Sequence, residues 1–121
     1  MKQISKRARV LTGGAALAAF GVGVFGTVSA NAAGHAEYTV TSGGQRLIAF
    51  GHALHSPIQV DHPEWPSTFD HDPVRSADRR RRLVAELEDP DTIGFGIHLA
   101  DATFGHVRRD GRGPAWRPLD L

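Results

Sequence analysis

Histidines are the residues in this chain whose number and placement are best suited to chemistry. All seven lie after residue 33 of the 121-residue sequence. Four of them, His35, His52, His55 and His98, lie beside a glycine or an expected strand end, where a side chain can face a shared cleft. Neutral imidazole is the commonest zinc ligand, and a catalytic zinc typically has three protein ligands and a bound water. These histidines are therefore candidates for a metal site.

Spacing alone leaves a second interpretation open, that these are ordinary surface or hydrogen-bonded histidines. The sequence has no His-x-x-x-His helix and no comparable compact ligand motif. It also has no cysteine, so neither thiolate ligands nor disulfides are available. The remaining histidines, His62, His71 and His106, are expected in loop or edge positions and receive no metal role.

Two short runs of β-branched, aromatic and apolar residues predict a β-hairpin that would position His52 and His55. They cover residues 38–41 and 46–50 and are joined through Ser42-Gly43-Gly44. Residues 56–72 contain three prolines and no sustained periodicity, which predicts a surface loop.

A helix is predicted after this loop. Asp72 is expected to be its N-cap and Pro73 its first residue, and Asp89-Pro90 should end it. Apolar residues within it follow helical spacing. The four consecutive arginines 79–82 would point around most of this helix, so we expect them to be solvated or paired with neighbouring acids such as Asp78, Glu86 and Glu88.

The last part of the chain is predicted to be three strands. Residues 93–98 form a short apolar run that would deliver His98 at its end. Residues 106–109 and 115–117 flank the turn Asp110-Gly111 and predict a closing hairpin. The order β-β-loop-α-β-β-β is of the α/β class.

The N-terminal segment has the pattern of an export signal. Basic residues 2–9 precede an apolar run over 10–28, and Ala30-Asn31-Ala32 fits a cleavage site. We therefore expect a helical signal peptide over residues 1–32, a domain over 33–121, and a periplasmic or secreted protein that meets a membrane only during export. An uncleaved membrane anchor is the alternative, which the five glycines of the run disfavour.

Charge argues against nucleic-acid binding. Residues 1–33 hold four basic and no acidic residues, so the rest carries 14 − 4 = 10 basic against 13 acidic residues, a net charge of about −3. No nucleic-acid partner is expected.

A series of short motifs along residues 34–121 adds a family resemblance. The chain resembles the C-terminal portion of metallo-β-lactamase-fold hydrolases, in the branch with methyl parathion hydrolase-like and lactonase-like enzymes. The motifs, in chain order, are Gly34-His35-Ala36-Glu37-Tyr38, Ser42-Gly43-Gly44-Gln45-Arg46-Leu47, Phe50-Gly51-His52-Ala53-Leu54-His55, Phe69-Asp70-His71-Asp72-Pro73, Arg82, Gly96-Ile97-His98-Leu99, Phe104-Gly105-His106-Val107 and Trp116-Arg117-Pro118.

The resemblance implies an α/β fold, namely the C-terminal half of an αββα sandwich with one sheet and its helix. The complete family holds two metal ions and hydrolyses esters, lactones, lactams or phosphotriesters. Carried over by position, His35 and His98 are implied metal ligands, and His52 stands where the family has a metal-bridging aspartate. His55 is implied to be a second-shell or substrate-lining residue. Zinc or another divalent metal is the implied cofactor, held by His35, His52 and His98, and an ester-like small molecule is the implied substrate.

Two departures from the family predict impaired or absent activity for this chain alone. The His-x-His-x-Asp-His motif occurs nowhere in the sequence, and a histidine at position 52 cannot bridge two cations as a carboxylate does. A truncated hydrolase is therefore expected. A half sandwich would leave an apolar sheet face open, so a homo-oligomer or a complementing partner is expected as well.

Two other functions stay open. Cleavage after Ala32 would create the terminus Ala33-Gly34-His35, whose amine, backbone nitrogens and imidazole suit a Cu(II)- or Ni(II)-carrying protein. A non-catalytic interaction domain is the other. Trp65 and Phe69 could equally line a substrate cleft or cover the open core.

Overall fold

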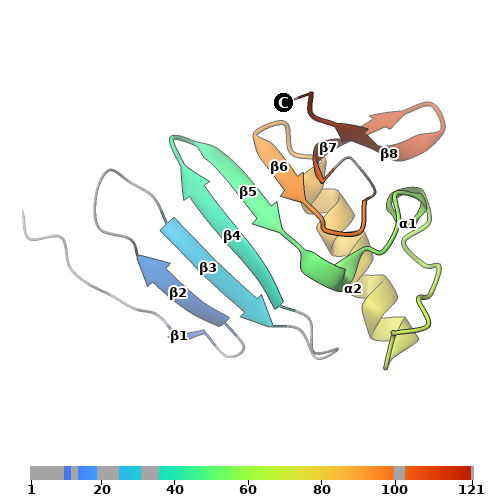
Figure 1. Cartoon of the computed structure of the whole chain (residues 1–121), viewed down its shortest axis with the longest axis horizontal. Coiled ribbons are helices and arrows are strands. Elements are labelled where there is room, and N and C mark those ends of the chain that lie inside the picture. The colour runs from blue at the N-terminus through green and yellow to red at the C-terminus, as the bar shows by residue number, and fades with distance from the viewer. Residues whose placement is uncertain (1–9, 12–13, 19–24, 31–35, 100–102, 121) are drawn as a thin grey trace, which may run out of the picture.

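One mixed sheet with a single long helix against it forms the described part of the protein (Figure 1). The structure is a computed structural model that describes residues 10–11, 14–18, 25–30, 36–99 and 103–120. Eight strands, β1 to β8, lie in the sheet in the order of the sequence. Every neighbouring pair is antiparallel except β5 and β6, which run parallel.

The predicted first hairpin is confirmed. Strands β4 (Ala36–Ser42) and β5 (Gln45–Ala49) pair from Tyr38↔Ala49 to Ser42↔Gln45. The turn between them places Gly43 and Gly44 at φ values of 58° and 81°. Two successive positive φ angles define the type I′ turn that matches the twist of a hairpin, and glycine adopts them without steric cost.

The predicted helix is also confirmed, as α2 (Pro73–Leu87). The Asp72 side chain accepts a hydrogen bond from the backbone N–H of Arg75 at 3.1 Å, which satisfies one of the free donors of the first turn. Positions at helical spacing are buried, namely Ser76, Ala77, Arg80, Leu83, Val84 and Leu87. This face therefore packs on the sheet.

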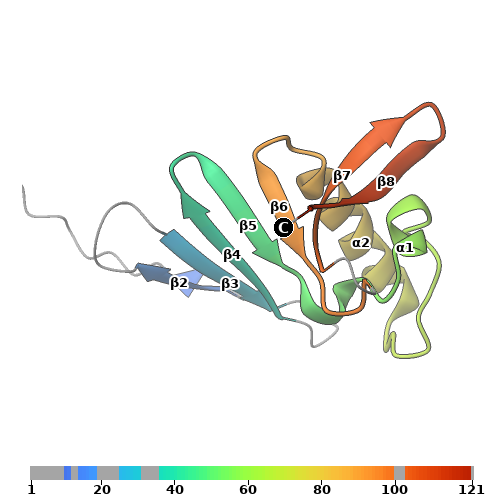
Figure 2. The same cartoon turned by 45° about the horizontal axis from the view of Figure 1, so that its top comes forward.

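Helix α2 connects the two parallel strands. It leads from β5 to β6 (Thr92–Phe95), since parallel neighbours require a long crossover connection. Its buried leucines pack with Ile48 and Phe50 of the β5 region and with Trp116 in one core cluster. Figure 2 shows α2 lying across one face of the sheet.

The predicted closing hairpin consists of β7 (Phe104–Asp110) and β8 (Gly113–Pro118). Gly105 lies opposite Pro118, and a Cβ added there would come within 2.6 Å of the Arg117 carbonyl oxygen. Only glycine allows this close approach of the two strands.

Two short helical segments lie between β5 and α2, the second of them within the loop predicted over residues 56–72. They are the 3₁₀ turn η1 (Gly51–Ala53) and the one-turn helix α1 (Ile58–Asp61). The Gln59 side chain accepts a hydrogen bond from the backbone N–H of His55, and buried Val60 anchors α1 in the core. These local and tertiary contacts override the proline-rich character of the segment.

The helix predicted within residues 1–32 is wrong for the parts that the structure describes. They form strands β1 (Val10–Leu11), β2 (Gly14–Ala18) and β3 (Phe25–Ala30). All six residues of β3 pair with β4. Glycines disfavour a helix, and the open edge of β4 offers each backbone group a partner. Whether residues 1–32 act as an export signal stays a prediction.

The face of β4 opposite α2 carries exposed apolar side chains. Glu37 is buried and forms an ion pair with Arg79 of α2, so it faces the helix. Tyr38 and Val40 alternate with it and are exposed. Among the described residues, no helix is long and apolar enough to cross a membrane.

Candidate metal centre

The parallel pair β5 and β6 brings three histidines to one edge of the sheet. Ala49 lies opposite Phe95, and the backbone N–H of Phe50 donates to the Phe95 carbonyl at 3.0 Å. Because the strands are parallel, the segments that follow them emerge side by side. His52 and His55 follow β5, and His98 follows β6.

Tight turns and buried neighbours fix the backbone on both sides of this edge. Gly51 has a φ of 52°, a left-handed conformation that ends β5 and begins η1. Leu54 is buried between the exposed His52 and the half-buried His55. Likewise the buried Leu99 anchors the segment that carries the exposed His98.

The three imidazoles lie in mutual contact. His98 Nε2 and His52 Nδ1 are 2.7 Å apart, a hydrogen bond whose direction is set by the tautomers of the two rings. The rings of His55 and His98 stack with centroids 5.1 Å apart and planes 16° from parallel. One nitrogen from each of His52, His55 and His98 lies within 4.8 Å of the other two.

This geometry fits a single divalent cation. Nitrogens bound at zinc distances of about 2.0–2.1 Å in a tetrahedral arrangement are about 3.3 Å apart. The rings of His55 and His98 are stacked, so they would have to reorient for one nitrogen of each to reach a shared ion. Neutral imidazoles suit zinc and its neighbours in the first transition row. Three protein ligands would leave a fourth position open, as catalytic zinc sites do.

A cavity of about 650 Å³ opens over the cluster. The three histidines line it together with residues of the segment that precedes α2, namely Phe69, Asp70 and His71. The Phe69 ring stacks on His55 with centroids 5.6 Å apart, while 68% of the residue is exposed. The Phe69 ring therefore forms an apolar wall beside the imidazole nitrogens that could bind a metal ion.

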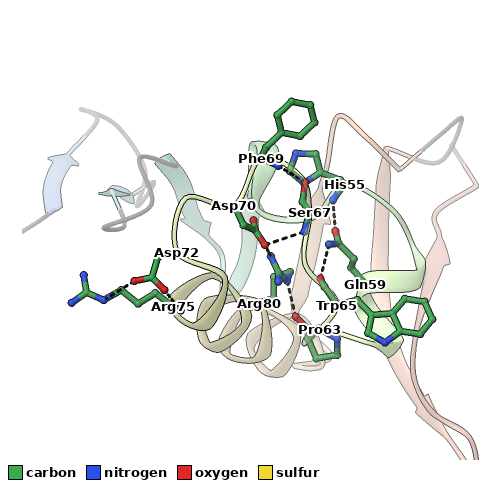
Figure 3. A network of polar contacts seen from close by, with 10 residues as sticks. All are labelled: His55, Gln59, Pro63, Trp65, Ser67, Phe69, Asp70, Asp72, Arg75 and Arg80. Carbon is green, nitrogen blue, oxygen red and sulfur yellow. Dashed lines mark hydrogen bonds and ion pairs between the residues drawn. The ribbon is translucent and has the colours of Figure 1, made fainter.

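A network of polar contacts holds this wall in place (Figure 3). Gln59 accepts from the backbone N–H of His55 at 2.7 Å and donates to the Trp65 carbonyl at 3.1 Å. Behind the wall, Arg80 donates to the Pro63 carbonyl at 2.6 Å and to Asp70 at 2.9 Å.

The histidines singled out from the sequence have different positions in the structure. His52 and His98 come together, whereas His35 lies outside the described residues. His55, expected to be second-shell or substrate-lining, lies among the potential ligands.

Phe69 lines the cavity and does not cover the core. Trp65 stacks on His62 with centroids 4.2 Å apart, and His106 bonds the Thr92 carbonyl.

Arg80 is buried, which differs from the expectation from the sequence. It was expected to be solvated or to pair with an acid on its own helix, but its side chain is 2% exposed and its partner Asp70 precedes the helix. The signal was present in the helical spacing. Position 80 falls on the same face as Ala77, Leu83 and Val84, so its side chain had to enter the interior.

Solved structures with a similar fold include a lactonase and two proteins described as hydrolases. AidC, a dizinc quorum-quenching lactonase in complex with a product, has a TM-score of 0.66 and 23% identity; the match covers 78% of this chain and 34% of AidC. The hydrolase AbOPH of the beta lactamase superfamily has a TM-score of 0.66 and 24% identity, over 73% of this chain and 31% of its own. A probable metal-dependent hydrolase from Staphylococcus aureus has a TM-score of 0.64 and 16% identity, over 79% of this chain and 36% of its own.

These likenesses define the fold. The described sheet and its helix are part of a metallo-β-lactamase fold, as the sequence motifs predicted. The chain spans about a third of the length of these structures. No family model and no curated protein matches the sequence. Within the described residues, His52, His55 and His98 form a group that could hold a metal ion.

Proposed function

We propose that this chain binds one divalent cation, zinc in the first place, through His52, His55 and His98, and that the site serves hydrolysis of an ester-like bond. The observation that carries the proposal is the approach of these three ligand nitrogens to within 4.8 Å of one another. A bound zinc ion would lower the pKa of its water to about 7 and polarise the bond to be cleaved.

The residues around the site support this substrate class. The cavity is large enough for a small molecule, and Phe69 gives it an apolar wall next to the ligands. Among the structural neighbours, AidC is a lactonase. Esters, lactones and phosphotriesters combine an apolar body with an electrophilic centre, so they suit a cavity of this kind.

We propose further that the 121 residues alone hydrolyse such substrates slowly or not at all. His52 stands at the position of the bridging aspartate that the family resemblance implies, and three neutral imidazoles leave no bridge to a second cation. A complementing partner or a second copy would then be needed on the face of β4 that carries the exposed Tyr38 and Val40.

Zinc titration of the purified chain tests the binding step. We expect one zinc per chain, lost on His98→Ala and kept on His62→Ala, since His62 stacks on Trp65 instead. Binding that survives His98→Ala would refute the site. Hydrolysis of a chromogenic ester and a lactone by the zinc-loaded chain then measures its activity.

Export to the periplasm or the medium is also part of the proposal. The order of a basic segment, an apolar run and the sequence Ala30-Asn31-Ala32 supports it. Mass spectrometry of the protein recovered from its host tests the point. A terminus at Ala33 agrees with a cleaved signal, and an intact Met1 in the cytoplasm contradicts it.

A further inference from the structure

We infer that Arg80 is a positioning residue for the metal centre, which orients His55 through the segment 63–70. This inference rests on the proposed metal site and concerns how the chain builds it. Arg80 lies on the buried face of α2, and its guanidinium reaches out of the helix to the segment that walls the cavity (Figure 3).

The guanidinium ties together the two ends of that segment. Its Nε donates to the Pro63 carbonyl at 2.6 Å, and its Nη1 donates to Asp70 Oδ2 at 2.9 Å. The same carboxylate oxygen accepts from the backbone N–H of Ser67 at 3.0 Å. One planar cation therefore fixes residues 63, 67 and 70 relative to the helix, a task that suits the rigid fork of arginine.

These contacts are withdrawn from water. The side chains of Arg80 and Asp70 are each 2% exposed. A buried ion pair of this kind gives little net stability, because desolvation offsets the attraction, while loss of one partner leaves an uncompensated charge. The pair therefore fixes one conformation of the segment more than it adds to the free energy of folding.

Phe69 connects this segment to the metal site. The backbone N–H of Phe69 donates to Ser67 Oγ at 3.2 Å, and this bond holds Phe69 between Ser67 and Asp70. The Phe69 ring stacks on His55, and His55 in turn stacks on His98. Gln59 adds a second support, since it binds both the His55 N–H and the Trp65 carbonyl of the same segment.

Asp70 also lines the cavity, and its Oδ2 accepts two hydrogen bonds from the protein. Arg80 thus acts on the geometry of the site without touching the ion or a substrate.

Cobalt(II) titration of the full chain, followed by visible absorption, tests the inference with a readout other than activity. Arg80→Gln should weaken Co²⁺ binding about tenfold, the scale on which outer partners of ligands act. Arg81→Gln is the matched control. Arg81 is the next residue of α2, its side chain is 52% exposed, and it pairs with Asp78 within the helix, so Co²⁺ affinity should stay within about twofold.

A double-mutant cycle with Phe69→Ala tests the proposed route. Phe69 is largely exposed, so its removal should leave the fold intact. If Arg80 acts through the Phe69 ring, Arg80→Gln should weaken Co²⁺ binding less than threefold in the Phe69→Ala background, because coupled residues are not additive. A purely structural role predicts the same loss in both backgrounds and would overturn the inference.

The outcomes separate this inference from the proposed function. A wild-type chain that binds no Co²⁺ refutes the metal site itself. A wild-type chain that binds, with a folded Arg80→Gln variant that binds equally well, refutes only the role of Arg80. If Arg80→Gln fails to fold, Arg80→Lys carries the same test, since it keeps the charge but lacks the planar fork that joins Pro63 to Asp70. Unchanged affinity in folded Arg80→Lys would then overturn the inference.

Discussion

His52 Nδ1 and His98 Nε2 lie 2.7 Å apart although 46 positions separate the two residues in the chain. The parallel pairing of β5 and β6 produces this contact, because it directs the segments after both strands to one edge of the sheet. In this arrangement two imidazoles are in hydrogen-bond contact and a third is stacked beside them. A cation bound among the rings would replace these contacts with three metal–nitrogen bonds.

His55→Ala should weaken zinc binding as strongly as His98→Ala does. The structure groups His55 with the other two as a potential ligand, whereas a residue that only lines the cavity would affect binding weakly. Competition for zinc with a chromogenic chelator measures the affinities. His71→Ala is the control, since His71 lines the same cavity outside the cluster. Equal affinities for His55→Ala and His71→Ala would assign His55 to the cavity wall alone.

Zinc should raise the thermal stability of the chain. At a free zinc concentration of about 100 times Kd, binding to the folded state adds about 2.7 kcal/mol to the free energy of unfolding. For a domain of this size that corresponds to a rise in Tm of roughly 10 °C. Differential scanning fluorimetry with and without zinc measures it. An equal rise in the His98→Ala variant would show that zinc acts elsewhere.

Gly105→Ala should destabilise the β7–β8 hairpin by about 1–3 kcal/mol. The new Cβ would lie 2.6 Å from both the Arg117 carbonyl oxygen and the Trp116 ring, so the strands must separate. Urea denaturation measures the change in the free energy of unfolding. Gly111→Ala is the matched control in the same hairpin, because a Cβ there meets nothing within 4 Å. Equal stability of the two variants would contradict the packing described for this hairpin.

Asp72→Ala should cost about 1 kcal/mol of stability through loss of the helix N-cap. The Asp72 carboxylate accepts a hydrogen bond from the Arg75 backbone N–H at 3.1 Å. Asp78 is not a cap, because it lies exposed within the helix and pairs with Arg81. Asp78→Ala therefore serves as the comparison in the same denaturation experiment. A cost for Asp78→Ala as large as that for Asp72→Ala would argue against the cap.

The local elements around the site could be predicted from the sequence because they follow from short-range rules. Gly43 and Gly44 between two β-branched runs specify the turn of the β4–β5 hairpin. Asp72 and Pro73 specify the start of α2. The family motifs then implied what no local rule contains, namely one sheet and its helix of a metallo-β-lactamase fold, which the structural neighbours confirm.

The long-range relationships of the site could not be predicted in the same way. The role of Arg80 depends on the return of residues 63–70 over α2, and this segment carries no periodic pattern. The resemblance implied that His55 lines the site, whereas its ring stacks on that of His98 across the edge of the sheet. The strands β1 to β3 arise where glycine-rich chain meets an open sheet edge, a competition that composition alone does not decide.

X-ray absorption spectroscopy of the chain loaded with one equivalent of zinc tests the central claim most directly, because it counts the ligands and measures their distances. We expect three imidazole nitrogens at about 2.0–2.1 Å, with the fourth position taken by a water oxygen, and we expect this three-imidazole signal to be lost in the His55→Ala variant. A spectrum with one imidazole or none, or one unchanged by His55→Ala, would contradict that claim.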